Sequence, residues 1–351
     1  MNTAHDIADE QSKLWNGPGG RAWVDTQELL DEIFRPFEDL LLNAVAAESR
    51  RRVLDVGCGT GATTLAVARL LGADGRSTGI DISEPMIAAA RARAEREGLP
   101  ARFICANAQA HAFEPAAFDM VVSRFGVMFF DDPVLAFANL RRAVEDAGGL
   151  QVIAWRSPAE NPFMTTAERA AAPLLPNLPA RRPGAPGQFA FADRDRVHAI
   201  LREGGWTGIE IEPLDVACAF PASELTRYLT RLGPVGVALE QADVEDPRAR
   251  DLGCPGGVRS VRARQRHPLH GGVLGGGRRG SHEGALMGGR ASSRTIRAAP
   301  TFGRCLAPTT ATVDPAECCQ GWPRLFFPGP LAPIVPEQAV CGDAPCRPRY
   351  A

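Results

Sequence analysis

Short apolar runs alternate with segments of helical periodicity through residues 52–212, and this alternation restricts the fold more than any other feature of the chain. The apolar runs are typical of buried strands, and the periodic segments are typical of amphipathic helices. A chain that alternates in this way forms a parallel sheet with helices on both faces. We therefore expect a Rossmann-like, doubly wound α/β fold that binds its ligand beyond the carboxyl ends of the strands. The expected strands are 52–56, 77–82, 102–105, 120–123, 150–155 and 209–212, and the expected helices are 63–71, 85–97, 134–144 and 194–203.

Charge and hydropathy exclude two classes of protein. The 351 residues carry 39 basic and 41 acidic side chains, whereas proteins that hold a phosphate backbone do so with clustered positive charge. We therefore expect no nucleic-acid partner. No run approaches the ~20 apolar residues of a bilayer-spanning helix, and Asp6, Asp9 and Glu10 stand where a secretion signal would be basic and then apolar. The expected location is the cytoplasm.

The last part of the chain differs in composition from the rest. Residues 1–250 carry 26 basic and 35 acidic groups, whereas residues 251–351 carry 13 and 6, together with six of the nine cysteines. Glycine and proline are frequent there and hydrophobic periodicity does not persist, so we expect residues 247–351 to form a low-order tail. Its cysteines and histidines lack the paired spacing of zinc modules, and we predict no metal site.

A change of reading frame is one interpretation of this tail. With codons typical of a GC-rich gene, residues 254–277 read one base out of register can encode a strand with alternating apolar positions. The hypothesis is that a frameshift near residues 246–252 replaced a closing strand. The alternative is that residues 247–351 are a genuine segment, and the nucleotide sequence distinguishes the two.

A glycine-rich loop, VLDVGCGTG at residues 53–61, follows the first expected strand. Glycines let the backbone turn tightly and approach a ligand, and the N-terminus of the next helix offers free N–H groups. Gly57, Gly59 and Ala62 also satisfy the dinucleotide pattern G-x-G-x-x-G/A. The loop alone therefore leaves a dinucleotide and a smaller nucleoside open.

Two acidic residues decide between these ligands. Asp55 lies just before the glycines, where its carboxylate would repel a pyrophosphate and attract an ammonium group. Asp81 ends the next strand, at a position from which an acidic side chain accepts hydrogen bonds from ribose hydroxyls. The pair favours an adenosine joined to a cation.

Residues 10–246 resemble a class I S-adenosylmethionine-dependent methyltransferase, similar to the ubiquinone/menaquinone-biosynthesis C-methyltransferases with a methyltransferase type 11 domain. The resemblance lies in residues 53–61, 79–86 (GIDISEPM), 107–109 (NAQ), 118–130 (FDMVVSRFGVMFF) and 148–150 (GGL). It implies a seven-stranded sheet whose last, antiparallel strand lies between the strands near Leu150 and Ile209. Because we expect residues 247–351 to form no such strand, we expect the sheet to lack a native last strand.

The resemblance also implies how the chain is divided. An N-terminal helical lid would span residues 1–48 and the methyltransferase domain residues 49–246. Substrate-cap insertions would occupy residues 157–191 and 213–246.

The cofactor that the resemblance implies is S-adenosyl-L-methionine. The family usually has aspartate where Asn107 stands, and the asparagine oxygen can accept the same hydrogen bond without charge assistance. The implied cofactor-binding residues are Asp55, Gly57, Cys58, Gly59 and Gly61 at the methionine end, Asp81 at the ribose, Ile82 and Met86 around the adenine, and Asn107 and Ala108 at its edge, together with Gln109 and Ser123.

The segments expected to cover this edge of the sheet are apolar, which predicts a small, apolar or aromatic acceptor. Trp15 and Trp23 would stack on the acceptor or anchor the helices of the lid. Arg124, Phe125 and Phe129 follow the fourth expected strand, where apolar side chains serve either as pocket wall or as core. These are the candidate substrate residues.

No catalytic base is assigned, because methyl transfer needs one only when the acceptor must lose a proton. His111 is a weak candidate, and Tyr228 and His198 are the other candidate side chains. The predicted function is methylation of carbon or oxygen on a small-molecule acceptor by an S-adenosylmethionine-dependent enzyme. A non-catalytic or inactive cofactor-binding remnant is the alternative, an oxidoreductase is a third possibility, and no oligomeric state is predicted.

Overall fold

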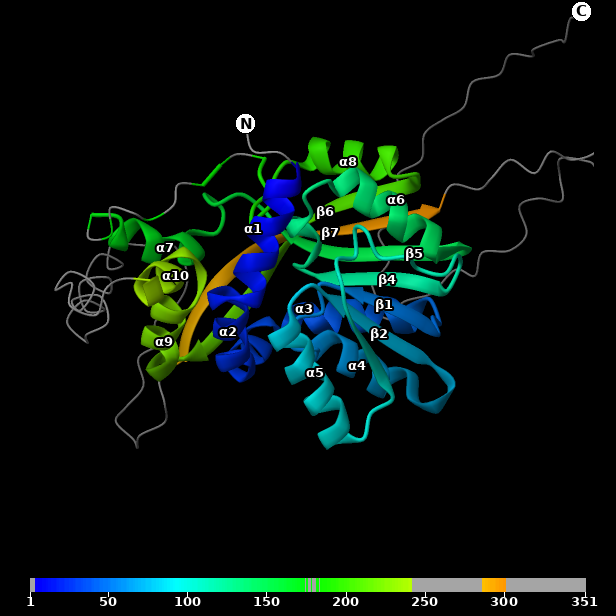
Figure 1. Ribbon diagram of the computed structural model, residues 1–351, viewed down its shortest axis with the longest axis horizontal. Coiled ribbons are helices and arrows are strands. Elements are labelled where there is room, and N and C mark those ends of the chain that lie inside the picture. The colour runs from blue at the N-terminus through cyan, green and yellow to red at the C-terminus, as the bar shows by residue number, and fades with distance from the viewer. Residues whose placement is uncertain are drawn as a thin grey trace, which may run out of the picture. The chain divides into compact units, whose positions relative to one another are not determined.

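Seven strands form a single sheet in the order β3-β2-β1-β4-β5-β7-β6 (Figure 1). β1 to β5 are parallel, and β7 is antiparallel to both of its neighbours. The expected seven-stranded, doubly wound α/β fold is thereby confirmed. The strands are β1 (Arg52–Val56), β2 (Arg76–Asp81), β3 (Ala101–Cys105), β4 (Phe118–Arg124), β5 (Val144–Trp155), β6 (Trp206–Pro221) and β7 (Leu286–Pro300).

The computed structural model describes residues 4–173, 175, 178, 181–182, 184–241 and 286–300. All of them belong to one unit, Met1–Gly303, and a second unit, Arg304–Ala351, lies outside the described residues.

Helices cover both faces of the sheet. In Figure 1, α3 (Gln27–Ala47), α4 (Ala62–Leu71) and α5 (Glu84–Glu97) lie on one side of the strands, and α6 (Pro133–Ala143) and α8 (Arg194–Glu203) lie on the other. The elements α4, α5, α6 and α8 begin within one residue of the positions expected from periodicity. Three short 3-10 helices complete this part: η1 (Gly72–Asp74), η2 (Val127–Phe129) and η3 (Ala222–Glu224).

Side-chain caps explain where three of these helices begin. The Ser83 hydroxyl accepts the backbone N–H of Met86 at 3.4 Å, and the Asp132 carboxylate accepts that of Leu135 at 2.9 Å. Asp193 caps α8 in the same way. Such caps satisfy N–H groups that have no partner within the helix.

The remaining helices come from the segments expected to form the lid and the caps. α1 (Ala4–Asn16) and α2 (Pro18–Asp25) belong to the expected lid. α7 (Pro162–Ala171), α9 (Leu225–Arg231) and α10 (Gly233–Gln241) belong to the two expected cap insertions. Residues of all five line one cavity where β1, β2 and β4 end.

The strand that we expected to be missing is present. β7 lies between β5 and β6, so that Ile296 pairs with Val152 on one side and with Ile211 on the other. All three side chains are buried. The prediction that the sheet lacks its last strand is wrong, because residues 286–300, inside the expected low-order tail, form it.

Polar contacts attach β7 to its neighbours. The Asn161 Nδ2 donates to the carbonyl of Ser292 at 2.8 Å, and its Oδ1 accepts the Ser292 N–H at 2.9 Å. Gln151 of β5 donates to the Thr295 hydroxyl and accepts from Arg297 at 2.6 Å. The strand is thus held by backbone pairing with β5 and β6 and by these polar contacts. Ile296 is the one large apolar side chain described as buried in it, and for that reason hydrophobic periodicity did not reveal the strand. The proposed frameshift at residues 246–252 lies outside the described residues and stays a prediction.

Candidate functional site

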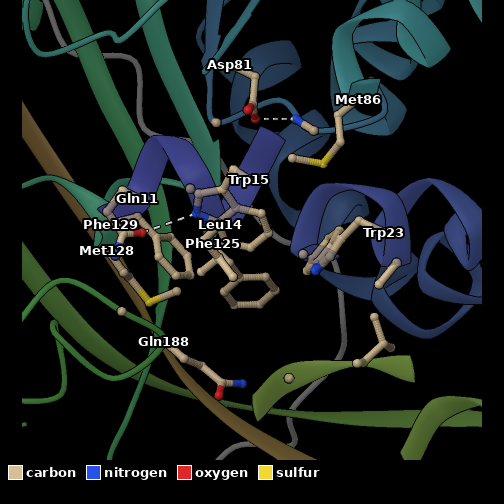
Figure 2. A pocket seen from close by; sticks show the side chains of 18 of the residues that line it. Gln11, Leu14, Trp15, Trp23, Asp81, Met86, Phe125, Met128, Phe129 and Gln188 are labelled. Atoms are coloured by element: carbon tan, nitrogen blue, oxygen red, sulfur yellow. Dashed lines mark hydrogen bonds between the residues drawn. The ribbon is translucent and has the colours of Figure 1, made fainter. Parts of the chain in front are cut away.

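A cavity of about 470 Å³ opens at the carboxyl ends of β1, β2 and β4. Figure 2 shows side chains around it from α1 and α2, from the end of β2 and the start of α5, from the segment after β4, and from Gln188. Many of the residues that we singled out in the sequence meet here. Those that line the cavity are Trp15, Trp23, Gly57, Gly59, Asp81, Ile82, Met86, Asn107, Ala108, Arg124, Phe125 and Phe129.

A second, smaller pocket of about 30 Å³ adjoins this cavity and shares Gly57, Gly59 and Arg124 with it. Asp55 and Cys58 line the small pocket and not the large one. Asp55 therefore borders a small annex of the cavity, which Gly57, Cys58 and Gly59 of the glycine-rich loop also line.

The glycine-rich loop adopts a conformation that side chains disfavour. Gly57 has φ +67°, and a Cβ atom there would lie 2.5 Å from the Cα of Gly126. Gly59 has φ +56°, but a Cβ atom there would meet only the sulfur of Met86, at 3.7 Å. Gly57 is therefore required by close packing, whereas Gly59 leaves open space beside the cavity.

Asp81 ties this loop to the end of β2. Its carboxylate accepts the N–H of Gly59 at 2.8 Å and that of Ser83 at 2.9 Å. Burial raises the pKa of Asp81, and the N–H donors of Ser83 and Gly59 act in the opposite direction. Each oxygen retains acceptor capacity for a further donor, and the side chain lines the cavity.

Asp55 is a fully buried carboxylate. Thr64 donates its hydroxyl hydrogen to the carboxylate at 2.7 Å. Burial raises the pKa of Asp55 to about 6, while Thr64 and the charge of Arg124 act to lower it. A cation placed in the annex would favour the ionised carboxylate and so recover part of the cost of its burial.

Three expected cofactor residues lie outside the lining of both pockets: Gly61, Gln109 and Ser123. The Gln109 Oε1 accepts the N–H of Asp132 at 3.0 Å. The Ser123 hydroxyl donates to the carbonyl of Val56 at 2.7 Å and accepts the N–H of Gly126 at 3.1 Å. Gln109 and Ser123 therefore connect loops around the site, a role that the sequence pattern does not distinguish from ligand contact.

The adenine-edge segment is also held locally. The Asn107 Oδ1 accepts the N–H of Gln109 at 2.9 Å, which closes a turn beside the cavity. The carbonyl of Ala108 accepts from the Asn139 side chain at 2.9 Å. The backbone at Asn107 and Ala108 is thus fixed in place where it lines the cavity.

Aromatic side chains form the other half of the cavity. Trp15 packs edge-on against Phe129 with ring centroids 5.1 Å apart, and against Trp23 at 6.2 Å (Figure 2). Phe125 stacks on Trp155 at 3.8 Å with the rings 7° from parallel. These rings pack against one another and also line the cavity. Phe125 and Phe129 are therefore both pocket wall and core. Arg124 lies beside them, 5.9 Å from the Phe34 ring and 3.9 Å from Glu38.

The candidate bases differ in position. His111 packs edge-on against Phe113 at 4.7 Å and is not among the cavity-lining residues. His198 is exposed on α8. Tyr228 lines the cavity, where burial raises the pKa of its hydroxyl.

Asp131, which the sequence reasoning did not select, also lines the cavity. Its Oδ1 is buried, and the described residues offer it no hydrogen-bond partner. Burial raises the pKa of this carboxyl. The available signal was its position directly after the aromatic segment that follows β4.

Among the described residues, no three His, Cys, Asp or Glu side chains gather as metal ligands. None of the described helices combines the length and hydropathy that a membrane span requires.

Comparison with known proteins identifies the domain. Residues 53–148 match the family described as a methyltransferase domain. The chain is 38% identical over 114 residues to a demethylmenaquinone methyltransferase of Thermus thermophilus, covering 32% of this chain and 51% of the relative. It is 34% identical over 128 residues to an aklanonic acid methyltransferase of a Streptomyces species, covering 36% and 57%.

The chain thus spans about half the length of these curated relatives. Among solved structures, phosphoethanolamine N-methyltransferase 2 of Haemonchus contortus is similar with a TM-score of 0.46 and 16% identity, covering 86% of this chain and 60% of that one. The glycine-rich loop, Asp55 and Asp81 all lie within residues 53–148, the part of the chain that matches the methyltransferase domain.

Proposed function

We propose that this protein transfers a methyl group from S-adenosyl-L-methionine to a small, apolar or aromatic acceptor. The observation that carries the proposal is that the glycine-rich loop, Asp81 and aromatic side chains line one cavity, and that Asp55 lines the small pocket beside it. The loop and the carboxylates fit a nucleoside with a cationic tail, and the aromatic side chains fit a flat apolar molecule.

The residues present fit the cofactor. Asp55 and the annex would hold the ammonium group of the methionine end, because a cation there favours the ionised carboxylate. Asp81 would accept hydrogen bonds from the ribose. Ile82 and Met86 would enclose the adenine, with the backbone at Asn107 and Ala108 along its edge. Cys58 and Gly61 would shape the loop, Ser123 would support it, and Gln109 would hold the segment after β4 through the N–H of Asp132.

The acceptor chamber supports the proposed substrate class. Trp15, Trp23, Phe125 and Phe129 line it, and such rings bind flat apolar molecules through large contact areas. Relatives named for demethylmenaquinone and for aklanonic acid add support for a small-molecule acceptor. Both C- and O-methylation fit this chamber.

Positioning supplies most of the catalysis that this site offers. When bound, the sulfonium of the cofactor supplies an electrophilic methyl group. The aromatic walls then need only hold the acceptor atom in line with it, and well-oriented reactants gain ~7–11 kcal/mol from proximity. For a hydroxyl acceptor, Asp131 would take up the proton, because it is a carboxylate with an unpartnered oxygen in the wall of the same cavity.

The main reason for the alternative of an inactive remnant no longer applies. That alternative was based on an expected gap in the sheet, and β7 fills this gap between β5 and β6. An oxidoreductase is disfavoured because residues 53–148 match a methyltransferase domain.

Calorimetric titration of the full chain tests the proposal. S-adenosylmethionine and S-adenosylhomocysteine should bind, and Asp81→Ala should abolish or strongly weaken both. Asp74→Asn is the matched control, because Asp74 is an exposed carboxylate in η1 and not a lining residue of either pocket. A folded protein that binds neither compound would overturn the proposal, and binding without methyl transfer to any of a panel of quinones and phenols would overturn the proposed acceptor class.

A further inference from the structure

Asn16, the last residue of α1, joins the lid to the loop between β2 and α5. Its Nδ2 donates to the carbonyl of Ile82 at 3.2 Å, and its Oδ1 accepts the N–H of Glu84 at 2.9 Å. Beside it, the Ser83 hydroxyl donates to the carbonyl of Trp15 at 2.6 Å. We refer to Asn16 and Ser83 as the clamp, because their hydrogen bonds connect two segments that are far apart in the sequence.

The clamp lies between the two halves of the site. On one side it holds the loop that carries Ile82 and the start of α5 that carries Met86, two residues proposed to bind the nucleoside. On the other side it holds the end of α1, where Gln11 and Trp15 line the aromatic half of the cavity (Figure 2). A displacement of the loop is therefore transmitted to the acceptor wall through two side chains.

The turn from α1 into α2 packs tightly against the same loop. A Cβ atom at Gly20 would lie 1.9 Å from the carbonyl oxygen of Trp15 and 2.8 Å from the hydroxyl of Ser83. Residue 20 must therefore be glycine for the clamp to close in this form, since no larger residue leaves room for the Trp15 carbonyl at Ser83.

α1 depends on such attachments. It has 13 residues, and an isolated helix shorter than about 12–15 residues is marginal in water. A marginal helix that forms the wall of a cavity opens at low free-energy cost and gives ligands a way in. A ligand that favours the closed arrangement shifts the population toward it.

We propose that Asn16 is a positioning residue that couples occupancy of the nucleoside site to closure of α1 over the acceptor chamber. The coupling rests on the proposed function for its ligand, but the clamp itself does not. A nucleoside that contacts Asp81 and Met86 immobilises the loop after β2. The immobilised loop presents the Ile82 carbonyl and the Glu84 N–H to Asn16. The end of α1 is then fixed, and Trp15 is held against Phe129. Binding of the cofactor thereby increases the fraction of molecules in which the acceptor chamber is closed.

The sequence offers a specific reporter of this closure. Lys13 is the only lysine in the chain and lies within α1, three residues before Asn16. Endoproteinase Lys-C therefore cuts the full chain at one position, and cleavage there requires local opening of α1. The rate of this cut, measured by intact-mass spectrometry, reports how often the lid leaves the loop.

Without any ligand, Asn16→Ala should be cut about tenfold faster than the wild type, because two hydrogen bonds that hold α1 closed are lost. Asn16→Asp should fall between the two, since its carboxylate can still accept the Glu84 N–H but cannot donate to Ile82. Ser12→Ala is the matched control: Ser12 contacts Asn16 within α1, at 3.5 Å, and not the loop. It should be cut at the wild-type rate, and all four proteins should melt at similar temperatures.

Addition of S-adenosylhomocysteine should slow the cut at least fivefold in the wild type and less than twofold in Asn16→Ala. An equal rate for ligand-free wild type and Asn16→Ala would overturn the clamp. Equal protection of the two proteins by S-adenosylhomocysteine, or no protection of a wild type that binds it by calorimetry, would overturn the coupling. Absence of calorimetric binding would instead overturn the proposed function and, with it, the coupling to that ligand. The cleavage rates of ligand-free wild type and Asn16→Ala would still test the clamp.

Discussion

The carboxylate of Asp81 and the backbone N–H of Gly59 are 2.8 Å apart, which joins the end of β2 to the glycine-rich loop after β1. The same carboxylate accepts the N–H of Ser83, the first residue after Ile82. One side chain therefore sets the position of two loops that line the cavity, and removing it should affect the ligand and the loops together.

Replacing Asp81 by asparagine should lower the affinity for S-adenosylhomocysteine about 10- to 100-fold, because hydrogen bonds to a charged acceptor contribute about 1.5–3 kcal/mol. Calorimetry on the wild type and on Asp81→Asn measures the change. Asp74→Asn, an exposed carboxylate on η1, should bind as the wild type does. Unchanged affinity in Asp81→Asn would place the nucleoside elsewhere.

The buried Asp55 predicts that cofactor binding depends on pH. Burial raises the pKa of this carboxyl to about 6, so the free protein is largely protonated there at pH 5 and largely ionised at pH 7. An ammonium group in the annex favours the ionised form. Affinity for S-adenosylhomocysteine should therefore rise from pH 5 to pH 7, with proton release near pH 6 visible in buffers of different ionisation enthalpy. In Asp55→Asn this dependence should disappear.

The same carboxylate should reduce the stability of the ligand-free protein at neutral pH. Its pKa in the folded state is raised from 3.8 to about 6, so the folded protein favours the protonated form more than the unfolded chain does. The cost is absent below the unfolded pKa, grows as the pH rises to about 6 and is complete above it. Asp55→Asn should thus raise the free energy of unfolding at pH 7.5 by up to about 3 kcal/mol, since an amide oxygen can still accept from Thr64. Thermal melts at pH 7.5 and pH 4 test this, and an equal gain at both values would contradict it.

Substitutions of Asp131 and of His111 should have different effects on kcat. Asp131 lines the cavity with an unpartnered oxygen, whereas His111 packs on Phe113 outside the lining. With a hydroxyl acceptor, Asp131→Asn should lower kcat about 10²- to 10⁴-fold, the range for loss of a general base. His111→Ala should keep kcat within about twofold of the wild type, because imidazole takes no part in that proton transfer. A larger loss of kcat in His111→Ala than in Asp131→Asn, measured by initial rates, would identify His111 as the base instead.

Asn161 should matter for stability through β7. Its side chain pairs with both the N–H and the carbonyl of Ser292 and is fully buried. Asn161→Ala leaves the Ser292 N–H without this acceptor, which costs about 1–3 kcal/mol for a buried unsatisfied group, whereas the Ser292 carbonyl keeps the N–H of Arg156 at 3.1 Å. Its melting temperature should fall well below that of the wild type, and a chain that ends at Gln241 should not unfold cooperatively. A melt of Asn161→Ala that coincides with the wild-type melt would show that β7 is not attached in this way.

The gene sequence around residues 246–252 tests the frameshift hypothesis directly. If codons there yield a closing strand in the neighbouring frame, the protein restored to that frame should melt at a higher temperature than this chain. That strand would bring an alternating apolar face to the position that β7 now fills with polar pairs such as Gln151 with Thr295. Equal melting temperatures for the two proteins would contradict the hypothesis.

The sequence by itself determined the alternation of strands and helices, and with it the edge of the sheet where the ligand would bind. Periodicity and capping act over one or two turns, so the starts of α4, α5, α6 and α8 could be predicted closely. Gly57, Asp55 and Asp81 could be found for the same reason, because their spacing along one strand and the next is local. The strand at 286–300 could not, because its attachment depends on Gln151 and Asn161, which are far away in the chain.

Only the tertiary structure decided which side chains share the cavity. Ser123 and Gln109 belong to the expected cofactor motifs but connect loops, whereas Asp131 lay outside the motifs and lines the cavity. The difference arises because a motif records which residues are near in sequence, while burial and direction of a side chain depend on every element packed against it. The clamp of Asn16 and Ser83 is the same kind of feature, since its hydrogen bonds exist only after α1 has docked on the loop that follows β2.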